Sequence, residues 1–227
     1  MIQITDTQTY GWKAAIRGMR NPMNSWDKSD SYFGPEYLED EDTYVKTFVG
    51  ANDYNLMTRL RNAGTDHRKY MRMIAVYCDI TAPLYWWKEF DTYKVGTVAN
   101  SCSTMHKIQA KEFTIDDFSH EHLDIYREHT MYAPNKYRFS STDLLKLEID
   151  VLNQCREKYL ETKDKRCWWQ MIQLLPSSYN QKRTVMMNYE VLANIYKSRK
   201  NHKLDEWHDF CDWIEKLPYS KLITGEE

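Results

Sequence analysis

The chain has 227 residues, of which 42 % are hydrophobic and 28 % charged. A chain of this length can bury about 70 % of its unfolded surface, and its ordinary composition excludes a disordered or fibrous protein. Its 31 Lys and Arg against 33 Asp and Glu give a net charge of −2, so we expect neither nucleic acid nor a membrane as a partner.

The absence of certain sequence features predicts where the protein is located and whether its cysteines are oxidised. No apolar run approaches the roughly 18 residues of a membrane helix. The first residues lack the basic and apolar regions of a signal peptide, so we expect a cytoplasmic protein. The five cysteines are odd in number and form no C-x-x-C pair, which predicts free thiols.

Strands and helices are expected to alternate in the first 90 residues. The sequence predicts a short strand over residues 1–5, a helix over 9–19, a surface loop over 21–44 that includes the acidic stretch 39–42, and a helix over 52–63. It then predicts a buried strand over 71–81 and an aromatic helix that begins at Ala82-Pro83.

The C-terminal half is expected to be mainly helical. Ser140-Ser141-Thr142-Asp143 has the Ser-x-x-Asp pattern of a helix start, and an apolar face continues beyond it. Further helices are predicted over 165–175, where Pro176 ends the pattern, over 183–199 and over 204–217. No linker composition divides the chain, which predicts a single domain over residues 1–227.

One segment near the C-terminus has a specific spacing. Leu175-Pro176 is followed by Asn188, Asn194 and Arg199, which lie thirteen, nineteen and twenty-four residues after the leucine. This spacing resembles the C-terminal motif of flavin-dependent thymidylate synthases without a gap. On one continuous helix, Asn188 and Arg199 would project from nearly the same side. The resemblance implies that the asparagines contact the flavin and that Arg199 binds the nucleotide.

A second segment strengthens the resemblance. The run Ile80 to Tyr85 is similar to the family's strand-to-helix junction, which precedes an Arg-His-Arg-x-x-Ser motif. Counting onward places Thr92, Tyr93, Lys94 and Thr97 at the Arg, His, Arg and Ser of that motif. Only the second basic residue and the hydroxyl are retained, as Lys94 and Thr97, and the resemblance assigns both to cofactor binding.

Counting backward from the same junction places His67 where the family carries a flavin-contacting histidine. The neighbouring glycine of the family is Asp66 here, and a glutamate that helps to hold the cofactor is Arg72. His67 therefore joins the predicted cofactor residues Lys94, Thr97, Asn188 and Asn194.

The expected substrate residues lie before and after the altered motif. Residues 99–106 correspond to a family segment that binds the uracil nucleotide, with Cys102 at its serine and Thr104 at its phosphate-binding arginine. A Cys102 thiolate could add to C6 of a pyrimidine, although an inert buried thiol is the favoured alternative. We assign catalysis to Cys102 and Arg199. Substrate binding is assigned to Lys88, Glu89, Ser103 and Arg199.

The resemblance, over residues 64–107 and 170–214, implies an α+β fold with a small sheet and long helices. It also implies a homotetramer that binds FAD and dUMP. In the family, the flavin mediates methylene transfer from methylenetetrahydrofolate to the pyrimidine nucleotide, with NADPH as the reductant. A flavin carries the hydride chemistry, so the protein must position it and exclude water.

Two other functions stay open. The protein could instead be a non-catalytic nucleotide-binding or assembly protein on the same scaffold. In that case the aromatic side chains would fill the position of the family's active-site pocket, as motivated by Trp86, Trp87, Trp168 and Trp169. Alternatively, His120 and His122, with several acidic residues nearby, could serve a metal-dependent hydrolase. Their spacing matches no strong zinc motif, so we assign no metal ligand.

Overall fold

The computed structural model describes residues 2–37, 43–132 and 136–225 and contains helices together with three small sheets. The strands are β1 (Gln3–Tyr10), β2 (Tyr32–Tyr37), β3 (Thr43–Phe48), β4 (Ala75–Pro83), β5 (Val98–Ser101), β6 (His129–Met131), β7 (Tyr137–Phe139) and β8 (Asn180–Asn188). The α-helices are α1 (Trp12–Arg20), α2 (Ala51–Asn62), α3 (Leu84–Phe90), α4 (Ser141–Thr162), α5 (Lys165–Leu174), α6 (Tyr189–Arg199), α7 (Asp205–Glu215) and α8 (Lys221–Thr224). The predicted α+β class is confirmed.

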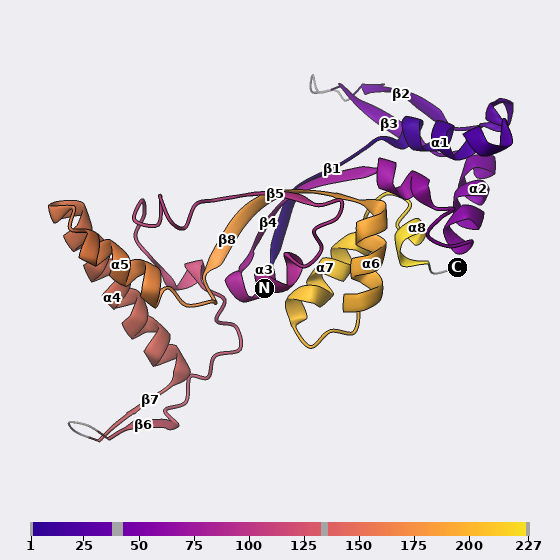
Figure 1. Cartoon of the computed structure of the whole chain (residues 1–227). Helices are drawn as coiled ribbons and strands as arrows, with labels where there is room; N and C mark the ends of the chain where they lie inside the picture. The colour runs from indigo at the N-terminus through magenta and orange to yellow at the C-terminus, as the bar shows by residue number, and fades with distance from the viewer. Residues whose placement is uncertain (1, 38–42, 133–135, 226–227) are drawn as a thin grey trace. The chain divides into compact units, whose positions relative to one another are not determined.

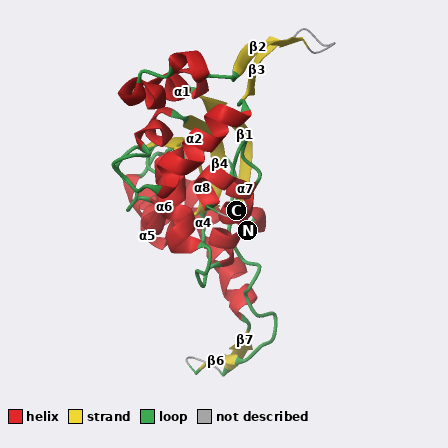
Figure 2. Ribbon diagram, turned by 90° about the vertical axis from the view of Figure 1, so that its right-hand side faces the viewer, coloured by secondary structure: helices red, strands yellow, loops and turns green. Residues whose placement is uncertain are grey.

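The main sheet has four strands in the order β1-β4-β8-β5, and two antiparallel hairpins, β2–β3 and β6–β7, form the others. Figure 2 shows the hairpins in yellow. The contacts group the chain into two compact units. The first comprises residues 1–3, 80–92 and 100–183, and the second comprises residues 4–79, 93–99 and 184–227. The single domain over 1–227 stays a prediction.

The first unit is built around α4 and α5, which lie side by side (Figure 1). Ser140 caps α4 by accepting a hydrogen bond from the Asp143 backbone amide, so the predicted helix start is confirmed. Leu145, Ile149 and Leu152 of α4 lie at helical spacing and form a buried cluster with Met171 of α5.

The second unit is built around α6, which contacts α7 and α8 (Figure 1). Most of α6 is buried, including Tyr189, Leu192 and Ile195, whose side chains are fully enclosed. Tyr189 also donates a hydrogen bond from its hydroxyl to the Pro218 carbonyl oxygen. The helix therefore exposes only a narrow polar face, on which Asn194 lies.

Several predicted elements differ from the structure. Residues 21–44 were expected to form a loop, but β2 and β3 form a hairpin there, and the acidic stretch 39–42 lies outside the described residues. The helix expected over 9–19 begins only at Trp12, because Gly11 ends β1 with a φ of 92°. The strand expected over 71–81 begins at Ala75, after a 3₁₀ turn over Lys69–Met73.

The most consequential correction concerns the helix predicted over residues 183–199. Residues 180–188 form β8, which lies between β4 and β5, and the helix starts only at Tyr189. The apolar side chains of Val185 and Met187 are fully buried at a spacing of two, as expected for one face of a strand. The idea that Asn188 and Arg199 share one helical face is therefore wrong.

Candidate functional site

The predicted site residues fall into two groups, each within one compact unit. Lys88, Glu89, Cys102 and Ser103 belong to the first unit. The other six belong to the second unit: His67, Lys94, Thr97, Asn188, Asn194 and Arg199. The second unit therefore carries every predicted cofactor residue.

Asn188 ends β8 and caps α6. Its Oδ1 accepts a hydrogen bond of 2.9 Å from the Val191 backbone amide, so the side chain satisfies one of the free N–H groups at the helix start. Gly96 packs directly against this cap with a φ of 78°, and a Cβ added there would lie 2.6 Å from Asn188 Nδ2. The structure thus brings Gly96, between Lys94 and Thr97 of the altered motif, next to Asn188 of the C-terminal motif.

Thr97 follows this glycine and is half-buried, whereas Lys94 is exposed. The Thr97 hydroxyl is buried and has no hydrogen-bond partner among the described residues. A buried hydroxyl without a partner is costly. A polar ligand group at this position would satisfy it, which fits the predicted cofactor role of Thr97.

Arg199, at the last turn of α6, lies between two aromatic rings. Its Nε donates a hydrogen bond of 2.9 Å to the Tyr93 hydroxyl, and its guanidinium carbon lies 4.7 Å from the centre of the Trp207 ring. Cation–π contacts of this kind hold a guanidinium in one orientation. Tyr93, which replaces the family's histidine, therefore positions the predicted nucleotide-binding arginine.

Asn194 lies on the exposed face of α6 and borders a cavity of about 450 Å³, which we call the cationic pocket. The pocket is lined by Arg61, Thr65, Arg68, Ala193, Asn194, Tyr196, Lys197, Lys200, Ile223 and Thr224. Arg68 donates hydrogen bonds of 3.2 Å and 3.0 Å from Nε and Nη2 to Glu190 Oε1.

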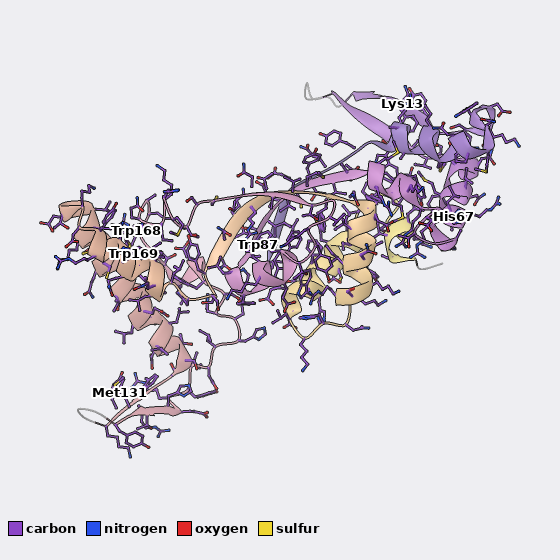
Figure 3. All side chains as sticks on the ribbon, viewed as in Figure 1. Lys13, His67, Trp87, Met131, Trp168 and Trp169 are labelled. Carbon is purple, nitrogen blue, oxygen red and sulfur yellow. The ribbon has the colours of Figure 1, made fainter. Side chains whose placement is uncertain are left out.

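The basic residues of this pocket were missed by the sequence analysis. Asn194, Lys197 and Lys200 lie three residues apart in the sequence, which places them along one side of a helix. This spacing could have indicated that the helix has one basic side. Arg61 and Arg68 come from another segment, so only the tertiary structure brings them to the same cavity. His67 is exposed in the turn between Arg61 and Arg68 (Figure 3).

In the first unit, Cys102 is a free thiol and is exposed, so the favoured alternative of a buried thiol is wrong. Its backbone amide donates to the Lys182 carbonyl oxygen, and its own carbonyl oxygen accepts from Gln181 Nε2. Ser103 accepts a hydrogen bond from the His106 backbone amide. These backbone bonds hold the Cys102 segment against β8.

Glu89 and Lys88 lie on α3, with Glu89 half-buried and Lys88 exposed. Trp86 and Trp87 of the same helix are fully buried and pack with Phe90. Trp87, which Figure 3 labels, also donates a hydrogen bond from Nε1 to the Gln181 carbonyl oxygen. These two tryptophans therefore belong to the core of the first unit.

Trp168 and Trp169 lie on α5 (Figure 3). Trp168 packs against the buried cluster of the first unit, whereas Trp169 is 43 % exposed. A cavity of about 860 Å³ in the first unit is lined instead by residues of the β6–β7 hairpin and α4 such as His129 and Glu148.

The metal-site alternative gains no support from the described residues. Within them, no group of three or more His, Cys, Asp or Glu side chains is arranged so that it could hold a metal ion. The His120 ring contacts the Phe118 carbonyl oxygen through Nδ1, and Glu121 accepts a hydrogen bond from Ser119. In the same described part of the chain, no helix is long and apolar enough to cross a membrane.

Comparisons with known proteins identify the fold. Neither a protein-family model nor a curated protein sequence matches the chain. Among solved structures, the flavin-dependent thymidylate synthase ThyX of Helicobacter pylori, complexed with FAD and dUMP, has a TM-score of 0.63 and 16 % identity, over 98 % of both chains. This chain has the fold of the flavin-dependent thymidylate synthases.

Two other solved structures share this flavin-dependent thymidylate synthase fold. A second ThyX structure from Helicobacter pylori with FAD and dUMP has a TM-score of 0.63 and 15 % identity, covering 99 % of this chain and 98 % of that chain. A UMP/dUMP methylase, PolB of Streptomyces cacaoi, bound with 5-Br dUMP, has a TM-score of 0.60 and 14 % identity, over 99 % and 94 %. The likeness extends over almost the whole chain, including the middle segment that the sequence motifs leave out.

Proposed function

We propose that this protein is a flavin-dependent transferase of the thymidylate synthase type, which adds a one-carbon unit to dUMP or a related pyrimidine deoxynucleotide. The observation that carries the proposal is the fold, shared over 98 % of the chain with a structure that contains both FAD and dUMP. FAD is the proposed cofactor, with NADPH and methylenetetrahydrofolate as co-substrates. We further propose a cytoplasmic homotetramer.

The residues of the second unit fit a flavin in three respects. Gly96 leaves room beside the α6 cap where a side chain would collide with Asn188. Thr97 offers a buried hydroxyl that needs a partner, and Asn194 presents an amide at a cavity. A bound flavin would supply hydride transfer. The chain's own groups would bind and orient it, while Arg199, held by Tyr93, would pair with an anionic or carbonyl oxygen of the nucleotide.

A visible absorption spectrum of the purified protein, repeated after addition of FAD and then of dUMP, tests this proposal. A bound-flavin spectrum that dUMP perturbs is the expected result. His67→Ala and Asn194→Ala should each lower the amount of flavin retained per subunit, with Lys203→Ala, an exposed substitution outside the pocket, as the control. Full flavin occupancy in both site variants would contradict the assignment of His67 and Asn194 to cofactor binding.

The proposed nucleophile needs its own test. We expect Cys102→Ala to abolish group transfer while dUMP still perturbs the flavin spectrum, because only the exposed thiol is removed. Cys78 and Cys211 serve as controls, since burial raises the pKa of the Cys78 thiol to about 12 and that of Cys211 to about 11. Retained transfer by the Cys102 variant would exclude the thiol from the reaction.

A non-catalytic nucleotide-binding protein on the same scaffold is the second candidate. It is favoured by the replacement of the family's Arg and His by Thr92 and Tyr93, and by the engagement of Arg199 with Tyr93. A colourless protein that does not bind FAD but binds dUMP would favour this candidate over a flavin-dependent enzyme.

A further inference from the structure

The cavity of about 860 Å³ in the first unit, which we call the hairpin cavity, is lined by the β6–β7 hairpin and the first half of α4 (Figure 1). None of the predicted cofactor or substrate residues lines it. Small-molecule sites have volumes of about 300–1,000 Å³, so this cavity has the size of such a site. Six of its described lining residues have apolar or aromatic side chains, namely Leu123, Tyr132, Phe139, Leu144, Leu145 and Pro176.

The hairpin holds the aromatic side of the cavity in place. His129 of β6 stands directly opposite Phe139 of β7 in the antiparallel register, and their ring centres lie 5.5 Å apart. His129 Nε2 also lies 3.0 Å from Ser141 Oγ, within hydrogen-bond distance, at the start of α4. An apolar or aromatic ligand can therefore pack against rings that are already positioned, and the faces of such rings also attract cations.

Apart from His129, the ionisable groups that line the hairpin cavity are acidic. Glu128 and Glu148 line it, and no Lys or Arg is among its described lining residues. The half-buried Glu148 carboxyl has no hydrogen bond or ion pair with the described residues, and burial alone raises its pKa. Arg127, which is near in sequence, is paired with Asp143 instead. Since burying an unpaired carboxylate costs free energy, the cavity favours a positively charged ligand.

We propose that the hairpin cavity binds a small organic cation, a protonated amine carried by an apolar or aromatic body. The ammonium group pairs with the Glu148 carboxylate, which thereby gains the partner that it lacks. The body packs against Phe139 and Leu144. The proposal goes beyond the proposed function, because a nucleotide phosphate would meet two carboxylates here and no basic lining residue.

Three probes of similar shape test the charge preference of the cavity. Phenylpropylamine, phenylpropanol and phenylpropionate carry a positive charge, no charge and a negative charge at neutral pH. In a ligand-observed NMR titration of the full-length protein, we expect saturable binding of the amine. The alcohol should bind roughly tenfold more weakly, and the carboxylate should not bind measurably. Absence of amine binding, or equal affinity for the three probes, would overturn the proposal.

A charge-removing variant tests the role of Glu148. We expect Glu148→Gln to lose roughly tenfold in affinity for phenylpropylamine and to bind phenylpropanol as the wild type does. Glu157→Gln, an exposed substitution on α4 outside the cavity, is the matched control and should leave both affinities unchanged. Far-ultraviolet circular dichroism checks that each variant is folded. If Glu148→Gln does not fold, the three probes on the wild type still decide.

Wild-type affinity of a folded Glu148→Gln for the amine would show that this carboxylate does not hold the ligand. Displacement of the amine by dUMP would contradict a site separate from that of the nucleotide. Neither result depends on FAD binding or on group transfer, so failure of this proposal is distinguishable from failure of the proposed function.

Discussion

Arg199 and Tyr93 are joined by a hydrogen bond of 2.9 Å from the arginine Nε to the tyrosine hydroxyl. Trp207 lies on the same guanidinium, with its ring centre 4.7 Å from the guanidinium carbon. The arginine therefore has one preferred orientation before any ligand arrives. A tyrosine thus takes a supporting role at the position where the family carries a histidine.

Replacing Tyr93 by Phe keeps the ring and removes the hydrogen-bond acceptor. We expect Tyr93→Phe to weaken dUMP affinity up to about tenfold, because the Arg199 side chain loses its hydrogen bond to Tyr93 and must then lose more conformational entropy on binding, out of up to about 2 kcal/mol for a long side chain. Titration of the protein with dUMP measures the effect. Tyr77→Phe, in an exposed tyrosine of β4, is the matched control. Unchanged affinity in the Tyr93 variant would contradict the positioning role.

Asn188 has a structural role that must be separated from its predicted flavin contact. We expect Asn188→Ala to lower the free energy of unfolding by about 1 kcal/mol, because the cap of α6 is lost. Asn188→Ser retains a capping oxygen and should unfold nearly as the wild type does in urea. If Asn188→Ser binds flavin fully, the amide has no part in holding the cofactor. Loss of flavin in the Ser variant would support the predicted contact.

Gly96 and Gly64 provide a comparison of two glycines with positive φ, at 78° and 105°. An alanine at Gly64 would meet nothing within 4 Å, so only the left-handed backbone costs free energy, about 1–2 kcal/mol. Gly96→Ala should cost roughly 1 kcal/mol more, because its Cβ would displace the capping amide of Asn188. Chemical denaturation measures both. Equal destabilisation would show that the Asn188 side chain moves aside freely.

Asp53 and Arg20 form a buried ion pair in the second unit, with side chains 0 % and 4 % exposed. Burial raises the pKa of the Asp53 carboxyl, but hydrogen bonds from Ser31, Ser29 and Arg20 outweigh it, so the pKa lies below its usual value. The stability that this group contributes is complete above the unfolded pKa of about 3.9. It is lost as the pH falls through the lowered folded pKa.

Asp53→Asn should therefore lower the free energy of unfolding by about 3–5 kcal/mol at pH 7, because it leaves the Arg20 charge buried without its partner. Urea unfolding at pH 7 and near pH 3 measures the effect. The variant should lose less stability than the wild type between the two pH values. An identical loss in both proteins would mean that other carboxyl groups account for the acid sensitivity.

Local signals predicted those elements whose ends are set by neighbouring residues. The capping box at Ser140 and the stop at Pro176 depend on bonds or clashes within a few residues, and both are confirmed. The strand-to-helix junction at Pro83 is local in the same way. The spacing of Asn188, Asn194 and Arg199, together with the junction segment from Ile80 to Tyr85, indicated the fold later found by comparison.

The tertiary structure decided what local patterns left ambiguous. Residues 183–187 suit a helix or a strand by composition, and their place in the sheet beside β4 makes them a strand, since the backbone groups of β4 supply the hydrogen bonds. The same applies to the cationic pocket. Arg61 and Lys197 are more than a hundred residues apart in the sequence. Only the packing of α2, α6 and α8 brings them to one cavity.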